Sequence, residues 1–328
     1  MRVTRRVAIA GLMGAGLVGA GFAASRAFGS TGGRISVALQ EGGTAAWEIA
    51  AMQAAGLDAA QGIAVDVRAV ADSKGGQVAL QAGAVDAMLS DFIWVSSQRR
   101  LGADFTFVPH ALVVGGLMAP PTGPVQSVMD LAGQVLAVAG GPNDKSFIIL
   151  QAYFNALTGK VLPDLITAKF GPPPLVNELL ISGQAQAALN FWHFNVRAGL
   201  AGMRQVVAVK DMLAELGVSQ TPPLLGWVFS ENGRVGDIRR FLDASFATKA
   251  LLLAEDAIWD RIRPVMKGAE TDDALFVALR AAYRAGIVTS YGAADVQAAR
   301  ETYAVLARYG VGNAEGLAAG TFWSGYAR

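Results

Sequence analysis

Aromatic, polar and glycine residues gather in a few short segments of the chain. Residues 40–47 read QEGGTAAW, residues 90–94 read SDFIW, and residues 190–195 read NFWHFN. Aromatic faces bind flat heterocycles by stacking and bind amines by cation–π contact, whereas backbone N–H groups at a glycine-rich helix start bind anions. None of these segments carries the arginine that nitrate and sulfonate sites often use. The residue types therefore favour a small organic solute over an inorganic anion.

Motifs of enzyme catalysis are missing from the sequence. The chain has no cysteine, which excludes thiol catalysis, disulfides and iron–sulfur clusters. Two histidines are too few for a histidine-rich zinc site. We find no G-x-S-x-G, S-x-x-K or H-E-x-x-H sequence and no nucleophile–base pair at a useful spacing. We therefore predict a protein that is not an enzyme and that uses neither a metal nor a cofactor.

The composition is that of a globular chain with large apolar cores. Of the 328 residues, 53% are hydrophobic and 16% are charged, and the net charge is +1. The length suggests two domains. No basic stripe with interleaved aromatic residues is present, so we expect no nucleic-acid partner.

Alternating strands and helices must position the candidate residues. Residues 34–40, 63–70 and 84–89 have the alternating apolar pattern of strands. Helices are expected over residues 44–55 and from Lys74 to residue 81. This order predicts a parallel, wound α/β sheet.

A second copy of this plan follows about one hundred residues later. LQAGAVDAML (80–89) aligns with LISGQAQAAL (180–189), and RISVALQ (34–40) aligns with QVLAVAG (134–140). Two matches at one offset predict two α/β lobes. The apolar segments 107–120 and 221–233 are expected to be two crossover strands that form a hinge, and helices are expected over 235–253, 272–287 and 293–310.

Ligands of wound α/β sheets lie beyond the carboxyl ends of the strands. Those ends give the candidate ligand-binding residues Gln40, Glu41, Gly43, Thr44, Trp47, Lys74, Asp91, Phe92, Asn143, Ser146, Asn190, Trp192 and His193.

Several candidates also have a purely structural interpretation. Trp47 fits the core as well as the site, Asn143 fits a helix N-cap, and His193 fits a buried structural histidine. Phe92 and Trp94 alternate, so we expect one of them to face the cleft and the other the core. Glu48 is interpreted as the negative residue that complements the positive end of a helix dipole. Glu41 is therefore the acidic residue to test for ligand binding.

Residues 1–30 have the layout of an export signal. Arg2, Arg5 and Arg6 precede an apolar, glycine-rich run that ends in small residues. Arg5-Arg6 is similar to a twin-arginine signal, and the general secretory route and a membrane anchor remain alternatives. Gly14 to Gly19 also match G-x-G-x-x-G, but a nucleotide site needs an acidic residue about 20 positions later, and residues 34–39 contain none.

The segments resemble those of bacterial periplasmic solute-binding proteins of ABC importers. More narrowly, they resemble those of the branch for nitrate, sulfonates, taurine and thiamine-pyrimidine precursors. The resemblance is carried by AAGLDAAQGIAVDV (54–67), LQAGAVDAML (80–89), VMDLAGQVLAVAGG (128–141) and LLISGQAQAALNF (179–191), and it covers about residues 34 to 310. Gln186 departs from the aspartate that is common in the family.

The resemblance implies a two-lobed clamshell of the type II periplasmic-binding-protein fold with two crossover strands. Lobe one would combine residues 34–118 with 223–328, and lobe two would span residues 119–222. Such a protein, expected to be a periplasmic monomer, closes on its solute by hinge rotation and passes it to an ABC permease in the inner membrane. The alternative is a non-transport periplasmic partner of an exported enzyme or sensor.

Overall fold

The computed structural model describes residues 32–309 and 315–328. The predicted export signal of residues 1–30 lies outside them. Within the described ranges, no helix is both long and apolar enough to cross a membrane.

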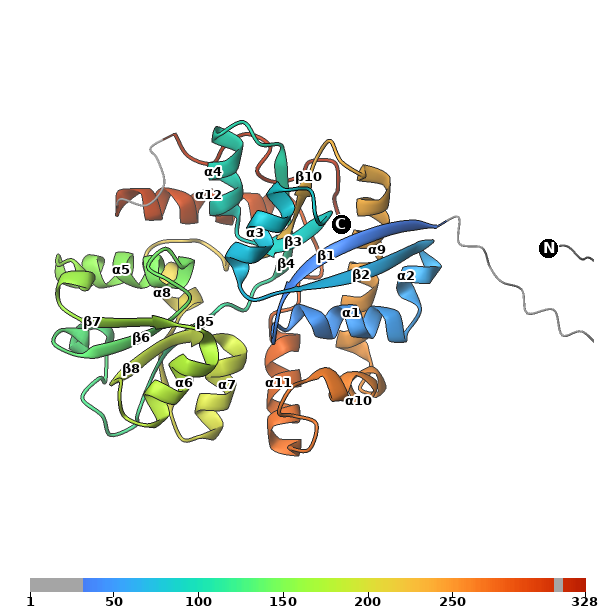
Figure 1. The fold of residues 1–328 in the computed structure, drawn as a ribbon. Helices are drawn as coiled ribbons and strands as arrows, with labels where there is room; N and C mark the ends of the chain where they lie inside the picture. The colour runs from blue at the N-terminus through green and yellow to red at the C-terminus, as the bar shows by residue number, and fades with distance from the viewer. Residues whose placement is uncertain (1–31, 310–314) are drawn as a thin grey trace, which may run out of the picture. The chain divides into compact units, whose positions relative to one another are not determined.

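The first sheet contains the strands of the amino-terminal segment and one late strand. Its order is β2 (Ile63–Val70), β1 (Gly33–Gln40), β3 (Ala87–Ser90), β10 (Leu225–Ser230) and β4 (Phe105–Ala111) (Figure 1). β1 runs parallel to β2 and β3, whereas β10 runs antiparallel to β3 and β4. Ile35, Val37 and Leu39 of β1 are all buried, which confirms the strand that their alternation predicts.

The second sheet has the same plan. Its order is β7 (Thr167–Gly171), β6 (Val135–Ala139), β8 (Ala187–Phe191), β5 (Gly115–Ala119) and β9 (Arg204–Ala208). β6 runs parallel to β7 and β8, and β5 runs antiparallel to β8 and β9. β8 therefore lies beside β6 as β3 lies beside β1. The internal repeat correctly predicted two related sheets.

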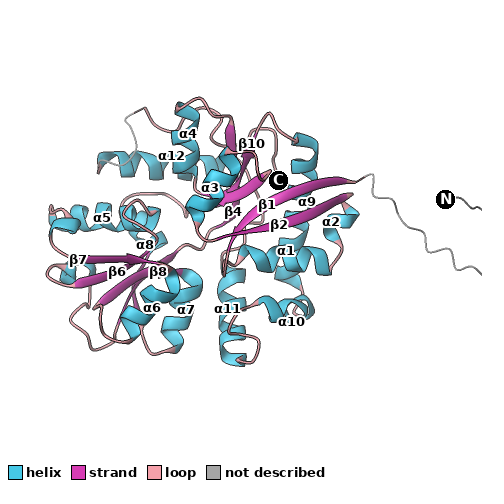
Figure 2. Cartoon of the chain, viewed as in Figure 1, coloured by secondary structure: helices cyan, strands magenta, loops and turns pink. Residues whose placement is uncertain are grey.

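Helices flank both sheets (Figure 2). They are α1 (Ala45–Ala54), α2 (Leu57–Ala60), α3 (Ser73–Gln81), α4 (Phe92–Arg100), α5 (Lys145–Thr158), α6 (Pro173–Ile181), α7 (Trp192–Leu200), α8 (Val209–Glu215), α9 (Val235–Ala254), α10 (Ala257–Ile262), α11 (Asp273–Ala285) and α12 (Ala293–Arg308). Short 3-10 helices cover Val128–Leu131, Leu162–Asp164 and Arg263–Val265.

The two predicted crossover strands are only partly correct. Residues 107–120 were expected to be one strand, but they are divided between β4 in the first sheet and β5 in the second. Residues 112–114 join them. Gly115 follows this link with φ of 129°, a backbone conformation that side-chain-bearing residues rarely adopt. The second segment forms a strand only over β10, and the residues before it lead from the second sheet to the first.

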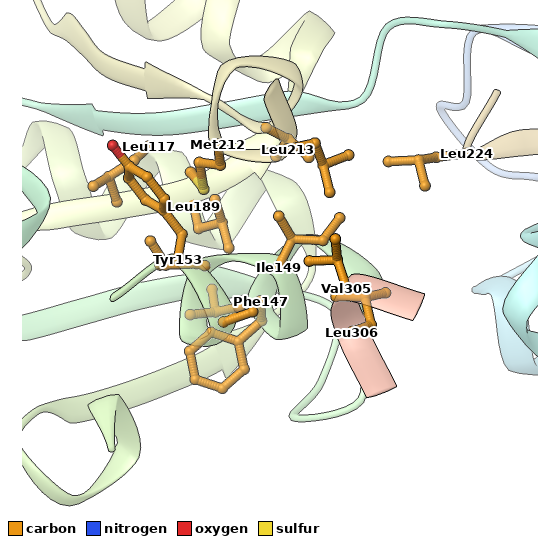
Figure 3. Close-up of a cluster of buried hydrophobic side chains, with 14 of the residues drawn as sticks. Leu117, Phe147, Ile149, Tyr153, Leu189, Met212, Leu213, Leu224, Val305 and Leu306 are labelled. Atoms are coloured by element: carbon orange, nitrogen blue, oxygen red, sulfur yellow. The ribbon is translucent and has the colours of Figure 1, made fainter. Parts of the chain in front are cut away.

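One apolar core contains residues from helices far apart in the sequence. Ile149 of α5, Leu213 of α8 and Leu306 of α12 belong to the same buried cluster (Figure 3). The carboxyl-terminal helix α12 thus packs near the helices of the second sheet.

Candidate ligand-binding site

A cavity of about 130 Å³ lies at the carboxyl end of β1. Gln40, Gly43 and Thr44 line it from the amino-terminal segment, and Trp192 and His193 line it from the start of α7. These five predicted residues, which come from strand ends of both sheets, therefore share one cavity. A buried water molecule needs about 10–15 Å³ of such volume, so there is room for roughly ten non-hydrogen atoms.

The rest of the lining is largely apolar. It includes Leu39, Met88, Val113, Val114 and Leu225. Val113 belongs to the link between the sheets, and Leu225 opens β10, so the cavity touches both connections. An apolar wall with few polar groups is typical of a small-molecule site.

His193, which lines this cavity, has a buried polar atom without a partner in the described part of the chain. Its side chain is 7% exposed, and Nδ1 has no hydrogen-bond partner among the described residues. Burial, together with the neighbouring charge of Arg197, lowers the pKa of His193 to about 3. The ring is therefore neutral at pH 7 and offers one donor and one acceptor. A buried polar atom without a partner calls for a ligand or water.

The start of α5 supplies a cation. Lys145 lines the cavity, whereas the predicted site residue Ser146 beside it is buried and lies outside the lining. The carboxylate of Asp144 caps the helix by accepting from the Ser146 N–H at 2.8 Å. Burial raises the pKa of Asp144, and the charge of Lys145 opposes that rise.

The two helices α1 and α7 begin at the cavity and have no side-chain N-cap. Thr44 precedes α1 and Phe191 precedes α7, and neither side chain caps its helix. Both residues line the cavity. Backbone N–H groups of a first helical turn lack intrahelical partners, so these two starts add donors near a bound molecule.

Trp47 does not line the cavity but packs behind a residue that does. Its side chain is 3% exposed, and its ring meets the edge of Trp192 at 6.0 Å and Tyr283 at 5.8 Å between centroids. Trp192 lines the cavity, so the contact with Trp47 helps to position the Trp192 ring.

Several predicted site residues have structural contacts instead. Phe92 is fully buried and packs on Phe107 and Phe322. Its neighbour Trp94 stacks on Phe105, with ring centroids 5.7 Å apart. The expectation that one of the pair faces the cleft finds no support, because neither lines the cavity.

Asp91 and Asn190 have their polar atoms engaged by the fold. The Asp91 carboxylate caps α4 by accepting from the Trp94 N–H at 2.8 Å. The Asn190 amide donates to the carbonyl of Pro173 and to the side chain of Asn177, and its Oδ1 accepts from the Phe191 N–H. The fully bonded Asn190 side chain positions a strand end rather than a ligand, whereas the Asp91 carboxylate uses one oxygen for the cap.

Three polar candidates are exposed and lie outside the cavity lining. They are Glu41, Lys74 and Asn143. The lining instead includes Asp72, Ser73 and Lys145. Lys145 is two positions from Asn143, so the predicted segment contributes a residue to the lining, but a different one.

Glu48 lies in the first turn of α1, as predicted, but its carboxylate belongs to a buried network that the sequence did not indicate. Glu48 is fully buried, and its carboxylate lies 2.8 Å from Lys249 Nζ and 3.6 Å from His110 Nδ1. Burial raises the pKa of Glu48, but the charges of Lys249 and His110 and the hydrogen bonds from Lys249 and Ser245 lower it more, so the net pKa is below its usual value. Sequence reasoning missed this network because its members come from distant segments.

This buried network adjoins the candidate site. A small cavity of about 20 Å³ is lined by Thr44, His110, Trp192, Lys249 and Tyr283, among others. Thr44 and Trp192 also line the larger cavity. The smaller space is large enough for one water molecule with several polar partners.

Comparisons with known proteins reveal similarity in structure rather than in sequence. No protein-family model matches the chain, and no curated protein matches it in sequence. The alkanesulfonate-binding protein SsuA from Xanthomonas axonopodis pv. citri, solved bound to MOPS, is similar with a TM-score of 0.68 and 16% identity over 88% of this chain and 98% of that chain.

Two further solved structures have a similar fold. The periplasmic aliphatic sulphonate binding protein SsuA from Escherichia coli has a TM-score of 0.64 and 14% identity, over 84% of this chain and 91% of that chain. The ligand binding component of an ABC-type import system from Staphylococcus aureus, with zinc bound, has a TM-score of 0.66 and 11% identity, over 88% and 96%. The chain therefore has the α/β fold of periplasmic solute-binding proteins, with two mixed sheets.

Proposed function

We propose that the protein is the solute-binding component of an ABC importer. It captures a small organic solute in the 130 Å³ cavity and delivers it to a permease of the inner membrane. The observation that carries this proposal is a cavity that strand ends of both sheets line, with the buried His193 in its lining. The fold shared with solute-binding proteins supports the same role.

The proposal includes two lobes, an exported location and a monomeric state. The sequence suggests residues 34–118 with 223–328 for lobe one and residues 119–222 for lobe two, and the first of these boundaries needs a change. Because β5 pairs within the second sheet, the first crossing between the lobes is best drawn at residues 112–114. Residues 1–30 are proposed to direct export to the periplasm by the twin-arginine or the general secretory route.

The proposed solute is a flat heterocycle of roughly ten non-hydrogen atoms. Phe191, Trp192 and His193 supply aromatic surface, and the apolar lining disfavours a bare inorganic ion. An amine would suit Asp72 but would meet Lys145, which lines the same cavity. Lys145 instead favours a solute with an acidic group, and alkanesulfonates are the second candidate class because of it.

A thermal-shift screen of the purified protein tests the proposal. The screen includes nucleobases, amines, alkanesulfonates and nitrate. A true solute raises Tm progressively with the logarithm of its concentration, equivalent to about 2.7 kcal/mol at one hundred times Kd, and is recovered chemically unchanged. His193→Ala and Trp192→Ala should remove the shift, whereas Lys74→Ala, an exposed control outside the lining, should keep it.

Two results would overturn the proposal. One is the absence of any concentration-dependent rise in Tm across all four compound classes. The other is a His193→Ala variant that binds the solute as tightly as the native protein does, since the cavity would then not be the binding site.

A further inference from the structure

A second, larger cavity lies against the same link between the sheets. Its volume is about 540 Å³. It shares Val113, Val114 and Trp192 with the first cavity, but its other lining residues are different and come mainly from α7, α8, α11 and residues 221–224. This volume lies within the range of about 300–1,000 Å³ that is typical of small-molecule sites.

The walls of the second cavity are mostly apolar. They include Met118, Val196, Met203, Leu213 and Leu224. Methionine side chains adapt to irregular apolar shapes. The cavity therefore suits a molecule with a largely apolar body.

Asn195 is a buried polar residue in the lining of this cavity. Its side chain is 7% exposed, and its Nδ2 donates to the carbonyl of Gly116 at 3.0 Å. That bond fixes the amide, and Oδ1 has no partner among residues 32–309 and 315–328. A buried acceptor that is held in place and left unpaired requires an N–H or O–H donor.

Lys210 supplies a charge at the same cavity. It is exposed, lines the cavity, and forms no ion pair or hydrogen bond within the described residues. A free ammonium at the edge of an apolar cavity attracts an acidic group. Asn195 and Lys210 together specify a donor and an anion on one apolar molecule.

We propose that this cavity is a second small-molecule site, distinct from the solute site, for an apolar organic acid that also carries an N–H or O–H donor. Because Val113, Val114 and Trp192 line both cavities, a molecule in the second cavity changes the affinity of the first. By linkage, the solute changes the affinity of the second cavity by the same factor.

The dye 1-anilinonaphthalene-8-sulfonate is a suitable probe, because it combines an apolar aromatic body, one N–H donor and a sulfonate. Titration of the purified protein, followed by dye fluorescence, should show saturable binding of one equivalent. Gly199→Phe should weaken binding by at least about tenfold. Gly199 lines the cavity, and a Cβ at this position would meet nothing within 4 Å, so the ring can enter the cavity without a backbone clash.

Two variants serve as controls. Gly236→Phe places the same ring on α9, where a Cβ also meets nothing within 4 Å and which lies outside both linings. Thr44→Phe narrows the first cavity and does not touch the second. Both should bind the dye like the native protein, and Lys210→Glu should weaken binding.

Three results contradict the proposal. The dye binds without saturation, Gly199→Phe binds it as tightly as Gly236→Phe does, or Thr44→Phe removes binding and so assigns the dye to the first cavity. None of these results bears on the solute screen, which is read from Tm with other compounds.

Discussion

Glu48 and Lys249 form an ion pair with almost no exposed surface. The exposed fractions are 0% and 2%, and the pair also contacts His110, Ser245 and Tyr283. Burial lowers the pKa of Lys249, and the carboxylate of Glu48 partly restores it. A buried pair contributes little net stability relative to apolar residues, but the loss of one partner leaves an uncompensated charge.

We predict that Lys249→Met lowers the free energy of unfolding by about 3–5 kcal/mol, because the Glu48 carboxylate remains buried and unpaired. Urea denaturation measures the change. The double variant Glu48→Gln, Lys249→Met should recover much of the loss, and the exposed control Lys74→Met should change little. A full-sized loss that persists in the double variant would show that packing, not charge, is responsible.

The two histidines make stability depend on pH. Burial lowers the pKa of His110 to about 4 and that of His193 to about 3, from an ordinary value of 6.5. Below about pH 6.5 the unfolded chain takes up protons that the folded chain does not, so stability falls as the pH is lowered. Above that pH both states are neutral at these positions and the effect disappears.

We therefore predict that His193→Asn flattens the decline in stability between about pH 6 and pH 4.5, by about 1.4 kcal/mol per pH unit. Urea denaturation at several pH values, with and without the substitution, gives the slopes. Equal slopes for the two proteins would mean that His193 titrates normally in the folded state and is not buried as described.

At the scale of elements, the link between β4 and β5 determines where the first crossing occurs. Gly115 opens β5 with a positive φ, and a Cβ there would lie 2.1 Å from the carbonyl oxygen of Asn190. Close approach of β5 to β8 thus needs a glycine. The same link carries Val113 and Val114, which line both cavities.

We predict that Gly115→Ala lowers the free energy of unfolding by more than about 1 kcal/mol, because it combines backbone strain with a steric clash. Gly236→Ala, at an open position in α9, should stabilise the protein by about 0.5–1 kcal/mol. Thermal unfolding measures both variants. Similar Tm values for the two would show that β5 can separate from β8 at little cost.

At the scale of the whole chain, two sheets with the same plan are joined by residues 112–114 and by the segment before β10. The candidate solute site is lined by residues of both connections and by strand ends of both sheets. A solute that contacts the strand ends of both sheets stabilises the arrangement in which both sets of contacts are made. The shared core of α5 and α12 must adapt to any such closure.

We predict that the solute identified by the thermal-shift screen makes the protein more compact. Small-angle X-ray scattering should show a decrease of a few per cent in a radius of gyration of about 19 Å, and a mass that stays monomeric. His193→Ala at the same solute concentration should show no decrease. A native protein that binds solute without compaction would indicate a rigid site and would contradict closure.

The sequence by itself determined the local elements and their repetition. Alternation of Ile35, Val37 and Leu39 predicted β1, because period-two patterns specify which strand face is buried. The offset of one hundred predicted two related sheets, and strand ends predicted that Gln40, Thr44, Trp192 and His193 would gather at one place. These inferences needed only short-range patterns and the rule that ligands lie at carboxyl strand ends.

Only the tertiary structure decided which side chains reach the cavity. It selected Lys145 rather than Lys74, and placed Phe92 in the core against Phe322. It also paired Glu48 with Lys249, about two hundred positions away. Local periodicity specifies the face of the strand or helix on which a residue lies. The partner that the residue contacts there depends on packing between distant segments, and the local pattern contains no information about that packing.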